Sequence, residues 1–137
     1  MCAEYLKKIL LRRILSLLAS IMLIMMLLCS GSAHAQFNIN RLISSGRVAL
    51  HYEDYVLSIQ YFSQVILLKP YMYESWQLRA VSKFYLDDYG GAESDATEAI
   101  KLNPYIPELY DLRGISRIRQ KKYADAIADY AKAIKLS

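Results

Sequence analysis

Few side chains of this 137-residue chain are suited to catalysis, and they lie apart from one another. His51 is the one histidine after residue 35, and acidic pairs occur at Glu53-Asp54 and Asp87-Asp88. Paired carboxylates can serve in acid–base catalysis or bind calcium, and a histidine can transfer a proton near neutral pH. Here each acidic pair precedes a helical segment, where helix capping and solvated charge explain it better. We therefore predict no catalytic set, no metal site and no cofactor, and we expect the chain not to be an enzyme.

The sequence also gives little support for a phosphate-binding loop, for cysteine chemistry or for nucleic-acid binding. Gly90-Gly91 lacks the lysine and the preceding strand of a phosphate-binding loop. The two cysteines, Cys2 and Cys29, both fall within the first 35 residues, so the rest of the chain has no disulfide and no thiolate metal site. The formal charge of +4 owes much to the N-terminus, and the remaining basic run, 117–122, lies at a helix end where cations suit the helix dipole. Nucleic acid is therefore not an expected partner.

The first 35 residues have the pattern of a secretory signal sequence. Four basic residues between positions 7 and 13 precede an apolar run over 14–28, and small residues follow, ending in Ala33-His34-Ala35. We expect a signal peptide over 1–35, cleaved before Gln36. The chain would then be exported to a bacterial periplasm or cell envelope.

Two other interpretations of the N-terminus stay open. In the first, the segment is an uncleaved anchor in the inner membrane. Fifteen apolar residues span about 22 Å, which is short of a hydrocarbon layer of about 30 Å, and a longer helix would include Arg12 and Arg13. In the second, Cys29 is acylated as in a lipoprotein, although Leu28 stands where a small residue is expected.

The rest of the chain repeats itself with a constant period. Four columns of residues keep this period: Tyr55, Tyr89 and Tyr123; Gly46, Ala80 and Gly114; Leu68, Leu102 and Leu136; Pro70 and Pro104. Such a 34-residue period indicates one structural unit copied three times. After a short linker at 36–38, we place the copies at 39–72, 73–106 and 107–137, the third ending before its final turn and without a capping helix.

Each copy is predicted to be two helices joined by a turn. In the second copy Trp76, Ala80 and Phe84 share one helical face, Asp88 can cap the second helix, and Asn103-Pro104 ends it. Glycine inside a helix costs about 1 kcal/mol relative to alanine, so Gly46 and Gly114 indicate close helix packing. Two further columns are expected at this contact, a small one and a bulky one in which Ala96 replaces the aromatic residue: Ser58, Ala92 and Ala126; Phe62, Ala96 and Tyr130.

The pattern over Ile39–Ser137 resembles the tetratricopeptide repeat (TPR) family. In the third copy the resemblance rests on Tyr110, Gly114, Tyr123, Ala126, Tyr130 and Ala133, and in the second on Trp76, Ala80, Tyr89, Ala92, Ala99 and Pro104. It implies an all-α fold, a right-handed α-solenoid of three antiparallel helix-turn-helix units, here preceded by a hydrophobic N-terminal helix. It also implies that the first helices line a concave groove, which binds a peptide or a partner helix.

One departure from the family pattern predicts ion pairs. Arg79 and Arg113 stand where the family often has leucine, and Asp95 and Asp129 follow each of them sixteen residues later. The first copy has Ser45 and Tyr61 at the corresponding places. We expect Arg79–Asp95 and Arg113–Asp129 to join the two helices of their units as structural pairs.

The resemblance also gives the residues that would line the groove. They are a mixed set with an apolar centre, Val81 and Ile115, flanked by acidic residues: Arg47, His51, Glu74, Gln77, Val81, Tyr85, Glu108, Asp111, Ile115 and Arg119. Some family members clamp the carboxylate end of heat-shock chaperones with lysine, asparagine and arginine. The residues at those positions here are Ile43, Arg47, Leu78, Glu108 and Leu112. Arg47 alone could hold a carboxylate and Glu108 would repel it, so we do not expect that activity.

Taken together, the sequence favours an exported, non-catalytic scaffold or adaptor that binds a protein or peptide of unknown identity. The alternatives are the N-terminal interaction arm of a longer protein whose catalytic part is missing here, and a membrane-anchored envelope assembly factor. Contact with a membrane is expected through residues 14–28 alone, if they are not removed. Self-association through the uncapped C-terminal end is a further expectation.

Overall fold

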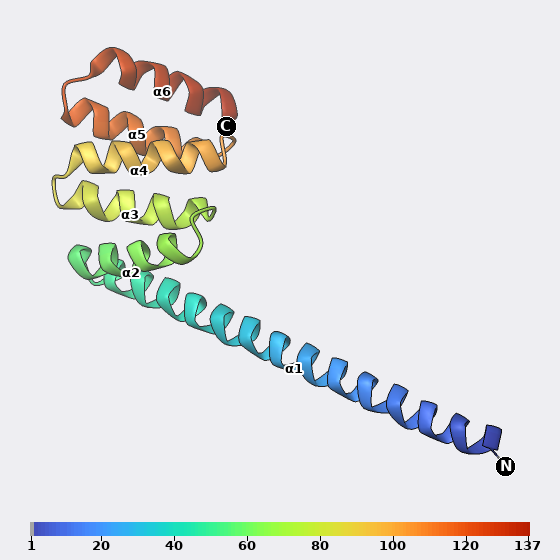
Figure 1. Cartoon of the computed structure of the whole chain (residues 1–137). Coiled ribbons are helices and arrows are strands. Elements are labelled where there is room, and N and C mark those ends of the chain that lie inside the picture. Colours follow the sequence, from blue (N-terminus) through green and yellow to red (C-terminus); the bar gives the residue numbers. More distant parts are fainter. Residues whose placement is uncertain (1) are drawn as a thin grey trace. The chain divides into compact units, whose positions relative to one another are not determined.

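The computed structural model describes the backbone of residues 2–137, and the side chains of residue 4, residues 7–26 and residues 38–137. The described part is all-helical (Figure 1) and contains these elements: α1 (Cys2–His51), α2 (Tyr55–Leu68), α3 (Tyr73–Tyr85), α4 (Tyr89–Leu102), α5 (Pro107–Arg119) and α6 (Tyr123–Leu136). It divides into two compact units, Met1–Asn38 and Ile39–Ser137. The predicted all-α solenoid is confirmed in the second unit, where consecutive helices from α2 to α6 pack side by side.

The turn inside each repeat has the same local structure in all three copies. Glu53, Asp87 and Lys121 all have φ near +60°, a conformation that non-glycine residues adopt at a cost. Asp54 then accepts a hydrogen bond from the backbone N–H of Leu57, and Asp88 from that of Gly91. The acidic pairs thus begin helices α2 and α4, as helix capping predicts.

Within each repeat, the small residue of the first helix faces a matched residue of the second. A Cβ on Gly46 would lie 2.9 Å from Cζ of Phe62, and one on Gly114 would lie 3.2 Å from the ring of Tyr130. In the second repeat, Ala80 takes the glycine position and Ala96 replaces the ring, and both are fully buried. Periodicity alone leaves Ala96 unexplained. The structure explains it, because Ala80 is larger than the glycine of the other repeats and leaves no room for a ring opposite it.

A second repeated contact holds the turns between repeats. Trp76 donates a hydrogen bond from Nε1 to the carbonyl of Pro70 at 2.8 Å, and the hydroxyl of Tyr110 donates to the carbonyl of Pro104 at 2.9 Å. The two bonds occupy equivalent positions of successive repeats, and each ties the start of a first helix to the preceding proline turn. The described buried residues all lie within Ile39–Ser137, so this unit has a core of its own.

The N-terminal unit differs from the expectation at one point. The sequence predicts a short linker at 36–38, whereas α1 continues through these residues. Residues 36–44 contain neither glycine nor proline, so nothing local ends the helix there. The side chains at the predicted cleavage point, Ala35 and Gln36, and those of Cys2 and Cys29 lie outside the described part.

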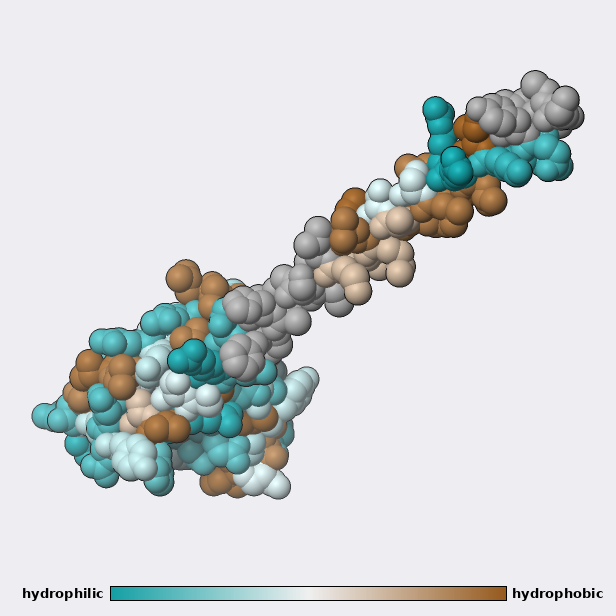
Figure 2. All heavy atoms as spheres, turned by 90° about the horizontal axis from the view of Figure 1, so that it is seen from below, coloured by the Kyte–Doolittle hydropathy of each residue, from teal (hydrophilic) through white to brown (hydrophobic). Residues whose placement is uncertain are grey.

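Within this unit, Lys7–Met26 is long and apolar enough to cross a membrane, a property that it shares with signal sequences. Figure 2 shows hydrophobic side chains along much of it and hydrophilic ones near its start.

The fit of Gly46 against Phe62 makes a prediction about stability. Gly46→Ala should lower the free energy of unfolding by about 1–2 kcal/mol, because overpacking against the ring outweighs the better helix propensity of alanine. In a Phe62→Leu background, the same change should raise it by about 1 kcal/mol, as the Ala80–Ala96 pair suggests. Urea unfolding of the four variants measures the coupling. Equal effects of Gly46→Ala in both backgrounds would contradict the proposed fit.

Candidate functional site

Two arginines join three helices each in the middle of the array. Arg79 contacts both carboxylate oxygens of Asp95, at 2.7 Å from Nε and 2.8 Å from Nη2, and Arg113 contacts Asp129 in the same way at 3.0 and 2.6 Å. Both predicted pairs are thus present and bidentate, an arrangement that adds geometric specificity. Each arginine also donates from Nη1 to a hydroxyl of the preceding repeat: Arg79 to Ser63 at 3.0 Å, and Arg113 to Thr97 at 3.3 Å. Ser63 and Thr97 lie 34 residues apart, so these contacts between repeats keep the period, but they were not predicted from it.

A second cation lies on each of the two aspartates. Lys83 is 2.9 Å from Asp95 and Arg117 is 2.8 Å from Asp129, and each aspartate side chain is 4% exposed. Lys83 and Arg117 again occupy equivalent positions in successive repeats. The buried aspartates are therefore surrounded by donors, as the cost of desolvating a carboxylate requires.

Glu93 extends this network across the junction between α4 and α5. It accepts hydrogen bonds from Arg117 at 2.8 Å, Gln120 at 2.9 Å and Lys122 at 2.7 Å. Burial by itself would raise the pKa of Glu93, but the bonds from Lys122, Arg117 and Gln120 outweigh it and lower the pKa from 4.5 to about 2. Glu93 is therefore a charged link between the second and third repeats.

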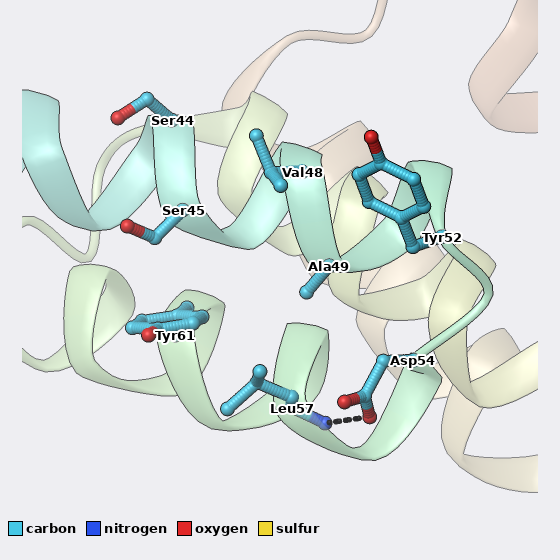
Figure 3. A pocket seen from close by; sticks show the side chains of 8 residues that line it. All are labelled: Ser44, Ser45, Val48, Ala49, Tyr52, Asp54, Leu57 and Tyr61. Atoms are coloured by element: carbon cyan, nitrogen blue, oxygen red, sulfur yellow. Dashed lines mark hydrogen bonds between the residues drawn. The ribbon is translucent and has the colours of Figure 1, made fainter.

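The first repeat lacks this network and contains a cavity in its place. Ser45, Ala49 and Tyr61 occupy the positions of the arginine, the second cation and the aspartate. The cavity, of about 370 Å³, lies between α1 and α2 (Figure 3) and is lined by Ser44, Ser45, Val48, Ala49, Tyr52, Asp54, Leu57 and Tyr61. Ser82 and Ser116, which correspond to Val48, are fully buried, whereas Val48 is 55% exposed. The cavity is therefore an open, largely apolar surface.

The predicted groove residues lie on the first helices, α1, α3 and α5. Glu74, Gln77 and Val81 are half-buried, and the others are exposed: Arg47, His51, Tyr85, Glu108, Asp111, Ile115 and Arg119. Helices α3 and α5 contact each other, so Val81 and Ile115 belong to neighbouring helices. We call the residues of this set on α3 and α5 the first-helix face.

The two ends of the first-helix face differ in charge: one is acidic, and the other carries Arg119. At its acidic end, burial raises the pKa of Tyr73, and the charges of Glu74 and Glu108 raise it further. At its other end, Arg119 lies over the ring of Tyr89 at 4.8 Å and 3.7 Å from Asp87. Arg119 is thus directed toward the start of α4.

Two more residues of the predicted set make aromatic contacts. Tyr85 stacks on Tyr55 with ring centroids 5.0 Å apart, and His51 meets Tyr52 edge-on at 5.3 Å. Among the described residues, no group of three or more histidine, cysteine, aspartate or glutamate side chains is placed to hold a metal ion.

Comparison with known proteins gives a match of the third repeat to one family model and a match of the fold to solved structures. Residues 107–137 match the family model described as Tetratricopeptide repeat. No curated protein sequence matches the chain. The first TPR domain of Spaghetti (RPAP3), solved with the HSP90 peptide SRMEEVD, is 26% identical, with a TM-score of 0.71 over 72% of this chain and 79% of that one.

Two further solved structures show the same fold. The TPR2B-domain:pHsp70 complex of yeast Sti1 is 19% identical, with a TM-score of 0.71 over 73% of this chain and 80% of that one. The TPR domain of Arabidopsis OM64 is 21% identical, with a TM-score of 0.72 over 75% of this chain and 85% of that one.

The lowered pKa of Glu93 predicts a pH-dependent contribution to stability. Its pKa is lower in the folded than in the unfolded chain, so the contribution is complete above pH 4.5 and is lost as the pH falls toward 2. Glu93→Gln should therefore lower the free energy of unfolding by about 1–2 kcal/mol at pH 7 and by almost nothing near pH 2. The loss at pH 7 is no larger because Lys122 is half-exposed, and solvent screens its interaction with Glu93.

Urea unfolding of both proteins between pH 2 and 7 measures this difference. Glu98→Gln, which removes an exposed carboxylate paired with Lys101, is the control and should change stability by less than about 0.5 kcal/mol at pH 7. A Glu93→Gln deficit that persists at pH 2 would contradict the assignment.

Proposed function

We propose that this chain is a non-catalytic module that binds a protein or peptide partner, because residues 107–137 match the tetratricopeptide repeat model and lie in one all-helical unit over residues 39–137. Peptide complexes among the structurally similar domains support this proposal, since RPAP3 and Sti1 were solved with HSP90 and Hsp70 partners. The observation that carries it is the first-helix face, in which apolar Val81 and Ile115 are accompanied by exposed charges. An apolar centre with a charged rim is the usual composition of a protein interface.

The partner that fits this face best is an amphipathic peptide or helix carrying basic residues. Its apolar side chains would cover Val81 and Ile115, and its cations would lie near Glu74, Glu108 and Asp111. An acidic peptide of the SRMEEVD kind suits these helices poorly, because Arg47 is the one cation among the five positions that would clamp its carboxylate. Glu108, on the first-helix face, would repel carboxylates.

We further propose that the module acts outside the cytoplasm, in a bacterial periplasm or cell envelope. The apolar helix Lys7–Met26 with its basic start supports this location, as a signal sequence or as an anchor in the inner membrane. An anchored chain would hold the repeats at the membrane as an envelope assembly factor. The array would equally serve as the N-terminal interaction arm of a longer protein.

The binding face can be tested by charge. In capture from native envelope extracts, residues 36–137 should retain a partner that Val81→Asp/Ile115→Asp loses, because buried carboxylates oppose apolar contact. The double variant Glu74→Lys/Glu108→Lys should also lose the partner. It is less prone to unfold than Val81→Asp/Ile115→Asp, because Glu108 is exposed and Glu74 is half-buried. Leu67→Asp, on the exposed surface of α2, is the control and should retain the partner.

Circular dichroism melts confirm that each variant is folded. A partner retained equally by both folded double variants would overturn the assignment of the first-helix face.

The proposed location can be tested on the intact protein. Mass spectrometry of the chain purified from the envelope fraction should find an N-terminus at Gln36 if the segment is a signal peptide. An N-terminus at Met1 in the membrane fraction would support the anchor instead. Recovery of a chain beginning at Met1 from the cytosol would contradict export in either form.

A further inference from the structure

The two turns between repeats lie on the same side of the repeat unit (Figure 1), and both expose apolar side chains. Tyr71 and Tyr105 occupy equivalent positions in these turns and are 67% and 76% exposed. Leu67, Leu68 and Leu102, in the helix ends that precede the turns, are exposed as well. We call this side of the unit the turn edge, and it consists of residues 39–42, 65–76, 99–110 and 133–136.

The backbone of both turns is held in place from the following helix. Trp76 and Tyr110 donate to the carbonyls of Pro70 and Pro104, which directly precede the two exposed tyrosines. The exposure of these tyrosines therefore belongs to fixed turns. Because they lie in successive repeats, a partner that contacts both must extend over more than one repeat.

The turns inside the repeats, on the opposite side of the unit, differ in charge. Two of them carry adjacent carboxylates, Glu53-Asp54 and Asp87-Asp88, whereas the turns between repeats, 69–72 and 103–106, contain none. Over the whole turn edge, basic residues outnumber acidic ones by four to two: Arg41, Lys69, Lys101 and Lys135 against Glu74 and Glu108. The turn edge is therefore better suited than the opposite side to an anionic surface with an apolar layer beneath it.

The chain enters the repeat unit at this same edge. Ile39, the first residue of the unit, occupies the position of Tyr73 and Pro107, which begin α3 and α5 after the two turns. In the sequence, twelve residues separate Ile39 from Lys7–Met26, the helical segment that is long and apolar enough to cross a membrane. That segment favours a bilayer over other occupants of the turn edge.

We propose that the turn edge contacts the surface of a lipid bilayer, with Tyr71 and Tyr105 between the headgroups and the acyl chains. Tyrosine is enriched at that depth in membrane proteins, because its ring is apolar while its hydroxyl stays hydrated. The exposed leucines enter beside the rings, and the lysines extend to anionic headgroups. The sequence placed membrane contact in residues 14–28 alone, and the turn edge adds a second contact.

The choice of a bilayer rests on the proposed location beside a membrane. Binding of a partner is not involved, since none of the five exposed apolar residues belongs to the first-helix face. The contact can be measured on residues 36–137, which include the whole core of the repeat unit. The contact and the proposed location are therefore tested in separate experiments, and either can fail alone.

Flotation with vesicles of phosphatidylethanolamine and phosphatidylglycerol tests the contact. Residues 36–137 should float with the vesicles at up to about 10 mM lipid, because interfacial contacts of this size are weak. Tyr71→Ser/Tyr105→Ser should lower the partition coefficient roughly tenfold, since two interfacial rings are lost. Tyr52→Ser/Tyr123→Ser removes two exposed rings from the opposite side of the unit and is the matched control, expected to bind as the wild type does.

Quenching by brominated lipids shows which side chains enter the bilayer. Trp76→Tyr removes the one tryptophan of the chain and introduces the residue of the third repeat. In that background, lipids brominated near the headgroup should quench a Tyr105→Trp probe and leave a Tyr52→Trp probe unquenched. Tyr105 and Tyr52 are 76% and 77% exposed, so the two probes are matched in accessibility to solvent.

Three results would overturn the proposal. The first is a wild type that stays unbound at the highest lipid concentration. The second is an equal loss of binding in both folded double variants, and the third is equal quenching of the two probes. Circular dichroism melts establish that the variants are folded. If Tyr71→Ser/Tyr105→Ser unfolds, the two tryptophan probes decide by themselves.

Discussion

The close approach of the two helices in each repeat is the constraint on which the rest of this structure depends. Gly46 and Gly114 allow it by leaving room for the rings of Phe62 and Tyr130, and Ala80 allows it because Ala96 stands opposite. The helix pairs so formed place Arg79 and Arg113 within reach of Asp95 and Asp129. A core of small and aromatic residues therefore determines where the charged network can form.

Much of this arrangement follows from the sequence, because a 34-residue period fixes which positions are equivalent. The helix pairs, the aspartate caps and the two Arg–Asp pairs were all predicted from equivalent residues. The contacts with Ser63 and Thr97 were not, because hydroxyl residues are common on helices and their partners belong to another repeat. The cavity of the first repeat was also missed, since it results from the combination of Ser45, Ala49 and Tyr61 and from no single residue.

The distribution of charge explains why an array of similar units has distinct surfaces. Between the second and third repeats, Glu93 and Arg117 have partners on both helices, so this junction is polar and internally satisfied. One period after Glu93, Ile127 is apolar and exposed, and Ala49 takes the place of Arg117 in the first repeat. The first-helix face is different again, with Glu74 and Glu108 at its acidic end. The face proposed for binding a partner is therefore distinct from the charged junction inside the array.

The packing of glycine against an aromatic ring can be measured directly in solution. In the NMR spectrum of residues 36–137, nuclear Overhauser contacts should join the α-protons of Gly114 to the ring protons of Tyr130, and those of Gly46 to the ring of Phe62. Both pairs lie within the few ångströms that such contacts require. Absence of both sets of contacts in a well-dispersed helical spectrum would contradict the packing on which the position of the charged network depends.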